Sequence, residues 1–201
     1  MQRRTFISSG LAALVLARPA VAQQLSLNEI SAYLNSIETA ISPFTQVNDD
    51  GTLNTGKLYL RRPGRMRFEY DPPNNLLVIA GAGQLGIFDG KSNVGTAERY
   101  PLRRTPLNLI LERNVDLARR NMVVGHDFDG TSTTVTMQDP EHPEYGSIAL
   151  NFTSDPVELR QWVIRDGQGA LTTVILGELE LGSQIAPRLF DINREEKNRN
   201  G

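Results

Sequence analysis

The chain has 201 residues, of which 39% are hydrophobic, so it can form one domain with a sizeable core. Its 21 lysines and arginines and 23 aspartates and glutamates give a formal charge of -2. This balance lacks the basic excess that drives nucleic-acid binding. The sequence has no cysteine, which excludes disulfides, thiolate nucleophiles and zinc–cysteine clusters.

The first 22 residues differ in kind from the rest of the chain. Arg3 and Arg4 give a charged start, residues 11–16 form an apolar run, and Ala20-Val21-Ala22 has the small-x-small pattern that signal peptidase recognises. This pattern predicts a cleaved export signal, and the paired arginines resemble a twin-arginine signal. A membrane anchor is the alternative, but residues 7–17 are only about half of the roughly 20 apolar residues that a membrane span requires.

Cleavage after Ala22 would leave one domain, residues 23–201. The loss of Arg3, Arg4 and Arg18 leaves 18 basic and 23 acidic residues, so the mature chain has a net charge of -5. Because a bacterial lipoprotein needs a cysteine at its cleavage site, this chain cannot itself be such a lipoprotein.

The segment from Ser26 to Ile41 carries the longest helical signal. Ser26 and Glu29 form a capping-box pattern at its start, and Pro43 is expected to mark its end. Apolar residues recur at steps of three and four, which predicts one apolar stripe on an amphipathic helix: Leu27, Ile30, Leu34, Ile37, Ile41 and then Phe44.

After Pro43 the period changes to two. Residues 57–61 and 65–70 alternate apolar and polar side chains, and Arg62-Pro63-Gly64 between them predicts a turn, so the pair reads as an antiparallel hairpin. One or two helical turns are expected at 106–111. Further strands are expected at 76–80, 85–88, 122–128, 132–138, 146–152, 158–165 and 171–181.

Eight to eleven short antiparallel strands with one main helix predict a mainly β fold, in which a single curved sheet forms a barrel or half-barrel. The tail from about residue 194 is polar enough to fray. The inward side chains Leu58, Leu60, Met66, Phe68 and Tyr70, covered by the two helical segments, could form either a packed core or an apolar cavity. Periodicity alone leaves both open.

Signals for chemistry are weak. His126 and Phe128 alternate with Asp127 and Asp129 on a strand that leads into an Asp-Gly turn, which favours a hairpin over a metal site. His142 lies in a proline-flanked loop and is a weak candidate for a general base. The common hydrolase, phosphate-loop and metalloprotease motifs do not occur, and we expect no metal or cofactor.

Several motifs together resemble the outer-membrane lipoprotein carrier (LolA) family. These are Phe44-x-Gln46, residues 56–70 with the sequence GKLYLRRPGRMRFEY, Leu85-x-Ile87-Phe88-Asp89, Thr105-Pro106-Leu107 and Phe190. The resemblance implies an unclosed β half-barrel with an α-helical lid. It also implies a monomeric periplasmic protein that is not an enzyme.

The same resemblance implies a function and partners. The protein would carry acylated lipoproteins from an inner-membrane lipoprotein-releasing ABC transporter to a receptor in the outer membrane. The arginine before proline, Arg62, would hold the lid closed. Met66 and Phe68, with Leu58, Leu60 and Tyr70, would line the acyl-chain cavity, and the lid would carry Leu34, Ile37, Ile41, Leu107, Ile110 and Leu111. The alternatives are an exported half-barrel that binds lipids or senses envelope stress, and an exported hydrolase.

Overall fold

The computed structural model describes residues 23–90, 95–119 and 121–201. The expected export signal at 1–22 lies outside the described residues. The helices and short 3-10 turns are α1 (Leu27–Ser36), η1 (Leu102–Arg104), α2 (Leu107–Leu111), η2 (Pro143–Tyr145), η3 (Pro187–Phe190) and α3 (Ile192–Asn200). The first strands are β1 (Thr39–Val47), β2 (Leu53–Arg61), β3 (Arg65–Tyr70), β4 (Leu77–Gly81), β5 (Gln84–Phe88) and β6 (Glu98–Pro101). The others are β7 (Val123–Phe128), β8 (Ser132–Gln138), β9 (Ser147–Ser154), β10 (Val157–Arg165), β11 (Leu171–Leu176) and β12 (Glu180–Leu181).

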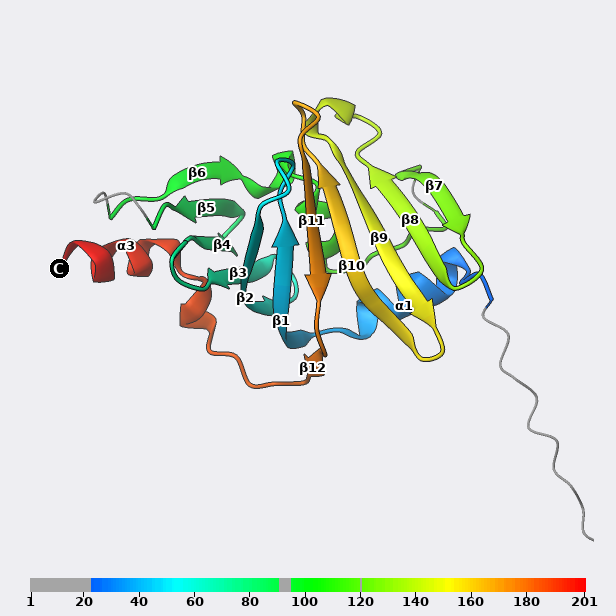
Figure 1. Cartoon of the computed structure of the whole chain (residues 1–201), viewed down its shortest axis with the longest axis horizontal. Coiled ribbons are helices and arrows are strands. Elements are labelled where there is room, and N and C mark those ends of the chain that lie inside the picture. The colour runs from blue at the N-terminus through cyan, green and yellow to red at the C-terminus, as the bar shows by residue number, and fades with distance from the viewer. Residues whose placement is uncertain (1–22, 91–94, 120) are drawn as a thin grey trace, which may run out of the picture.

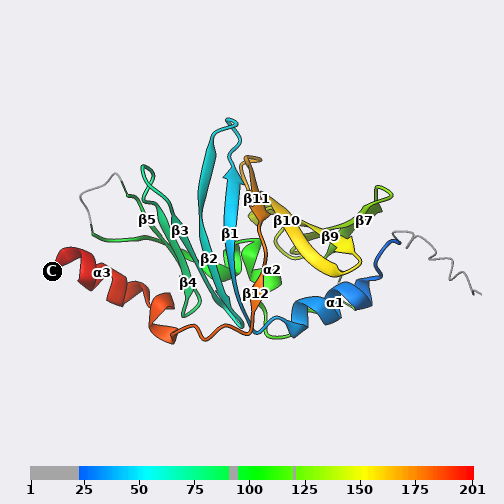
Figure 2. The same cartoon turned by 60° about the horizontal axis from the view of Figure 1, so that its bottom comes forward.

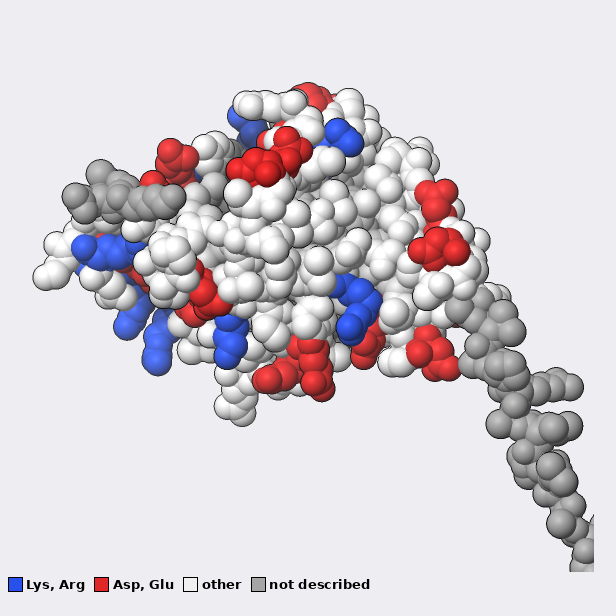
Figure 3. Space-filling model, viewed as in Figure 1, with Lys and Arg blue, Asp and Glu red and all other residues white. Residues whose placement is uncertain are grey.

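Within the described residues, all twelve strands belong to one antiparallel sheet in the order β6-β5-β4-β3-β2-β1-β11-β10-β9-β8-β7, with β12 paired to the start of β1. The sheet is strongly curved but not closed, and its ends are β6 and β7 (Figures 1 and 2). The predicted mainly β half-barrel is therefore confirmed. Figure 3 shows few charged side chains over the central strands β1, β11 and β10 of the outer face.

The predicted helix from Ser26 begins as expected and ends earlier. Ser26 caps α1, and both hydrogen bonds of the capping box with Glu29 are present. Ile37 already has an extended backbone, and Thr39 starts β1, which pairs with β2 along its whole length. The prediction that Pro43 marks the helix end was wrong, because Pro43 lies within a strand.

Pro43 is tolerated in β1 because of its position in the pairing. β1 pairs with β12 at Ala40 and Ile41 and with β11 from Phe44 onward, so Pro43 lies where the partner strand changes. A proline has no backbone N–H to donate, and such a break in the ladder removes the need for one.

The two faces of the sheet bury different clusters. On β4, Val78 and Ala80 belong to the large inner cluster with α1 and α2, whereas Leu77 and Ile79 belong to an outer cluster with Ile192 of α3. This alternation follows from the two-residue period of a strand. The tail from 194, expected to fray, is helical instead, because Asp191 caps α3 and Ile192 is buried.

The outer cluster also includes polar contacts that hold the C-terminal segment on the sheet. The buried Arg67 of β3 donates to Glu69 at 2.6 Å, to the Leu189 carbonyl at 3.0 Å and to Glu195 of α3 at 3.4 Å. Arg99 pairs with Glu196 at 2.8 Å. The C-terminal segment thus covers one face of β3–β5 and leaves the opposite, concave face to α1 and α2 (Figures 1 and 2).

Candidate functional site

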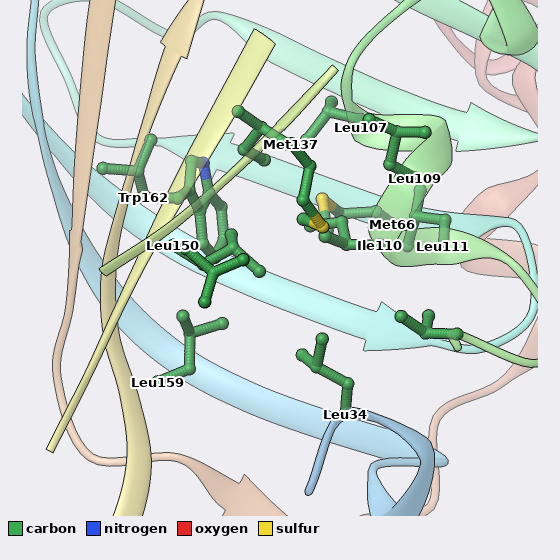
Figure 4. Packing of buried hydrophobic residues seen from close by; sticks show 14 of the residues in the cluster. Leu34, Met66, Leu107, Leu109, Ile110, Leu111, Met137, Leu150, Leu159 and Trp162 are labelled. Carbon is green, nitrogen blue, oxygen red and sulfur yellow. The ribbon is translucent and has the colours of Figure 1, made fainter. Parts of the chain in front are cut away.

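The concave face of the half-barrel is lined by apolar side chains from both halves of the sheet. Met66 of β3, Met137 of β8 and Ile110 of α2 lie close together at its centre (Figure 4). All five residues predicted to line the interior face this side: Leu58, Leu60, Met66, Phe68 and Tyr70. The structure brings these side chains together, and their role with acyl chains remains a prediction.

Four aromatic rings pack edge to face in this interior. Phe44 lies 5.3 Å from Phe68 and 5.1 Å from Tyr70, and Phe68 lies 6.3 Å from Trp162, measured between ring centroids. Such contacts stabilise a packed core beyond the area they bury. The Tyr70 hydroxyl donates to Gln46 at 2.5 Å, and burial raises its pKa to about 12. The Phe-x-Gln pattern is thus part of the interior wall.

The lid consists of α1 and α2, which cover the concave face. Leu34 points inward from α1, and Ile37 is the first residue after that helix. Leu107, Ile110 and Leu111 lie on α2, and all five side chains are buried. The assignment of Ile41 to the lid was wrong. Ile41 lies on β1 and packs against the outer cluster with Tyr59, because the helix ends before it.

The interior is almost filled in this closed form. A residual apolar cavity of about 30 Å³ remains between the lid and the sheet, lined by Leu34, Ile110, Leu111, Met66 and Trp162 among others. This volume is about that of one water molecule. The sequence left open whether the interior is a packed core or an apolar cavity. In the closed state the lid side chains fill most of the space, so the interior is packed like a core.

Arg62 connects the hairpin turn to both lid helices. Its Nη1 donates to the Leu34 carbonyl, and its Nη2 donates to the Glu112 carbonyl at 2.6 Å and to Asn35 at 3.2 Å. Both carbonyls lie at the C-terminal ends of helices, where acceptors have no partner in a following helical turn. The Leu34 carbonyl also accepts from the Ile37 amide at 3.4 Å. Burial lowers the pKa of the Arg62 guanidinium, and the Glu112 carboxylate opposes this shift.

The backbone of the same turn adds further contacts to the lid. The Arg62 amide donates to the Glu38 carbonyl at 2.8 Å, and the Gly64 amide donates to the Leu111 carbonyl at 2.8 Å. Gly64 has a φ of 70°, a conformation that favours glycine. Arg-Pro-Gly is therefore a connector between the sheet and the lid as well as a turn.

Asn35 completes the connection between the lid segments, and sequence analysis missed it. Its amide nitrogen donates to the Val115 carbonyl at 2.8 Å, and its side-chain oxygen accepts from the Val115 amide at 2.9 Å. Ser31, one turn earlier, accepts from the Leu117 amide at 3.0 Å. A polar residue on an exposed helix position carries no sequence signal for such a long-range contact.

Trp162 was missed for a geometrical reason. It lies on β10 with Leu159, and both are buried in the interior although a spacing of three should place them on opposite faces. The β9–β10 register shifts between Leu159 and Gln161, and this bulge restores the inward direction. The indole Nε1 of Trp162 and the Nε of Arg62 have no hydrogen-bond partner within the described residues.

The two histidines serve local contacts. A ring nitrogen of His126 lies 2.8 Å from the Leu25 carbonyl, and His142 stacks on Tyr145 and lies 3.0 Å from Glu144. In the described part of the chain no three histidine, aspartate or glutamate side chains gather as metal ligands would. The helices described there are all too short or too polar to cross a membrane.

The sheet is an open antiparallel half-barrel, and two helices bound by Arg62 cover its apolar interior. These features define the class of this protein as a lidded half-barrel. A sequence profile described as "Outer membrane lipoprotein carrier protein LolA" matches residues 35–193. The chain therefore belongs to the LolA family.

Relatives of known name are distant but cover most of the chain. It is 24% identical over 186 residues to an outer-membrane lipoprotein carrier protein of Nitrosomonas europaea, and the match covers 89% of each chain. A protein of the same name from Pseudomonas paraeruginosa is 22% identical over 174 residues, 82% of each chain. A solved domain from Vibrio parahaemolyticus, provisionally described as an outer membrane lipoprotein-sorting protein domain, matches the fold with a TM-score of 0.53 at 9% identity, covering 85% of this chain and 97% of that one.

Proposed function

We propose that this protein is a periplasmic carrier that shields the acyl chains of lipoproteins in its interior and moves them from an inner-membrane ABC transporter to an outer-membrane receptor. It performs no catalysis in this role. The observation that carries the proposal is the apolar interior under a lid to which Arg62 donates hydrogen bonds from both ends of its guanidinium fork. Membership of the LolA family and the names of the relatives support it.

The energetics explain why such cargo needs a carrier. Exposing one methylene to water costs about 0.8 kcal/mol, so an acyl chain of about 15 methylenes costs about 12 kcal/mol. This cost prevents an acylated protein from crossing an aqueous compartment alone. A concave apolar surface removes most of it.

Loading requires that the lid open, because the residual cavity of about 30 Å³ cannot hold an acyl chain. Opening separates Arg62 from the carbonyls of Leu34 and Glu112. Hydrogen bonds to a charged group contribute about 1.5 to 3 kcal/mol each. Burial of one acyl chain therefore exceeds the cost of breaking these bonds, and the bonds favour closure once the chain leaves.

Depletion of the protein in its native host tests the proposal. We expect outer-membrane lipoproteins to accumulate in the inner membrane and to return to the outer membrane when the wild-type gene is restored. Membrane fractionation followed by immunoblotting measures both. Unchanged lipoprotein sorting would overturn the proposal and favour a half-barrel that binds free lipids or senses envelope stress.

A further inference from the structure

A large groove lies beside the lid at the closed end of the β2–β3 hairpin. It has a volume of about 830 Å³, and its walls come from the end of α1, the hairpin turn, Arg113 and the segment 182–186 that follows β12. Figure 2 shows the course of the backbone that forms one wall, where the chain leaves β12 toward α3. The volume is within the range of roughly 300 to 1,000 Å³ that is typical of ligand sites.

The groove is strongly basic, although the chain as a whole is not. Four arginines line it, Arg61, Arg62, Arg65 and Arg113, and Glu38 is the only acid among its described lining residues. The whole chain has a formal charge of -2. A groove lined by one sign of charge concentrates the field and attracts ligands of the opposite sign.

Two of the four guanidinium groups are available to a ligand. Arg61 donates to the Ile185 carbonyl, and Arg62 donates to the lid carbonyls. The guanidinium groups of Arg65 and Arg113 form neither a hydrogen bond nor an ion pair with any residue that the structure describes. A guanidinium group presents five donors in a planar fork that matches a carboxylate or a phosphate.

The groove lies next to the interior, and residues shared by both form the wall between them in this closed form. Ile37 and Arg62 line both the groove and the residual cavity, so the groove begins where the lid meets the sheet. When the acyl chains of a cargo protein lie in the interior, its polypeptide must leave across an edge of the half-barrel. The edge at Ile37 and Arg62 is one such exit. An extended chain that leaves the interior on this side would pass Arg65 and Arg113 directly afterwards.

We infer that this groove binds acidic residues in the polypeptide segment that follows the acylated end of the cargo, an inference that rests on the proposed carrier function. Carboxylates at successive positions of an extended segment can meet Arg65 and Arg113 in turn. A single phosphate would occupy only part of a groove of about 830 Å³, which favours a peptide. Cargo with an acidic segment therefore binds more tightly than cargo with a neutral one.

The test compares acylated peptides that carry either four glutamates or four serines after the acylated residue, together with the same peptides without lipid. Binding to the wild-type protein is compared with binding to Arg65→Ser/Arg113→Ser. The matched control is Arg103→Ser/Arg104→Ser, which removes the same charge from two exposed arginines that do not line the groove. Fluorescence anisotropy gives the affinities at low and high salt.

We expect the wild-type protein and the control to bind the acidic acylated peptide about tenfold more tightly than the neutral one at low salt. Salt should reduce this preference, and the groove variant should lose it while it still binds the neutral acylated peptide. Equal affinities in the wild-type protein, or a preference that survives in the groove variant, would overturn the inference and leave the carrier function standing.

The remaining outcomes separate the inference from the proposed function. If the lipid-free acidic peptide binds through Arg65 and Arg113 while neither acylated peptide binds more tightly than its lipid-free form, the acidic-peptide site stands and the carrier function fails. Inorganic phosphate is added as a competitor of the lipid-free acidic peptide. If phosphate displaces it at concentrations lower than the peptide's own dissociation constant, the groove is a phosphate site and the inference is overturned.

Discussion

Arg62 joins three segments that lie far apart in the sequence: the hairpin turn, the end of α1 and the residue after α2. One side chain can do this because its donors diverge in a fixed plane, so each reaches a different carbonyl. A lysine ammonium in its place is a compact point charge and cannot reproduce the planar fork. The guanidinium is therefore suited to hold the ends of two helices at once.

Replacing Arg62 with leucine is expected to separate loading from delivery. Arg62→Leu removes the donors and leaves an apolar side chain beside the interior, so acyl-probe binding should persist. The closed lid then loses the hydrogen bonds of this side chain, and transfer of a lipoprotein to receptor-bearing membranes should slow by about tenfold or more. Acceptance from inner membranes and transfer to acceptors are measured separately.

The control is Arg194→Leu, which makes the same change at an exposed arginine of α3, the helix on the outer face of the sheet. It should load and deliver like the wild type. Delivery by Arg62→Leu at the wild-type rate would show that Arg62 has no part in closing the lid.

Whether a site residue could be predicted from the sequence depended on the kind of contact it makes. Alternation along β2 and β3 was enough to place Leu58, Met66 and Phe68 on the inner face. It failed at Trp162, because a bulge changes the alternation, and at Asn35, because the contacts of this side chain join residues about 80 positions apart. The lid contacts of Arg62 were expected only from family resemblance, since an arginine at a turn is by itself an ordinary surface residue.

Among the elements, α1 and β1 show why helical spacing misled the sequence prediction. Steps of three and four continue from Leu34 through Ile37 to Ile41 and Phe44, and the stripe looked like one helix. The β-branched residues Thr39, Ile41, Thr45 and Val47 favour a strand instead, and the full ladder with β2 overrides the helical pattern. The inward side of β1 then carries Phe44 into the interior, while Ile41 faces outward.

The C-terminal helix α3 stabilises the sheet from outside. Ile192 lies in the outer cluster, where its side chain approaches Gly86 so closely that a Cβ at Gly86 would lie 3.1 Å from it. Arg67 is buried beneath this segment with Glu195 as one partner. A polar composition hid this contact in the sequence, because one buried isoleucine and a capping aspartate give little signal.

Replacing Ile192 with alanine is expected to lower the free energy of unfolding by about 2 to 4 kcal/mol, since it removes a buried side chain from a small cluster. Acyl-probe binding by the folded variant should stay unchanged, because the cluster lies on the outer face. Urea unfolding and probe titration measure the two. Lys197→Ala, at an exposed position of the same helix, is the control and should change stability by less than about 0.5 kcal/mol. Reduced acyl binding by folded Ile192→Ala would show that the two clusters are coupled.

The whole molecule has two apolar clusters on opposite faces of one sheet, and they differ in what covers them. The outer one is covered by its own C-terminal segment, with ion pairs to Arg67 and Arg99. The inner one is covered by two helices that the Arg62 turn and Asn35 hold in place. The contacts that hold the C-terminal segment are therefore separate from those that hold the lid.

The interior assignment is tested by a charge at its centre. Phe68→Glu would place a charged carboxylate next to Phe44 and Trp162 in the apolar interior, so a folded variant should lose acyl-probe binding. Trp162 is the only tryptophan in the chain, so its fluorescence reports acyl binding at the interior directly. We expect the emission to change when a saturated acyl probe is added to the wild-type protein and to stay constant in Phe68→Glu.

The control is Leu53→Glu, which makes a similar change at the first residue of β2, paired with Val47 of β1 and 66% exposed, and it should bind the probe normally. Circular dichroism shows whether each variant is folded. If Phe68→Glu does not fold, Phe68→Leu keeps the test open, because it retains an apolar wall and should bind the probe with an affinity within about tenfold of the wild type. Wild-type affinity in folded Phe68→Glu, or a tryptophan emission in the wild type that does not respond to a bound probe, would place the acyl chains elsewhere. The first result would show that the wall tolerates a charge, which an interior that shields acyl chains from water cannot do.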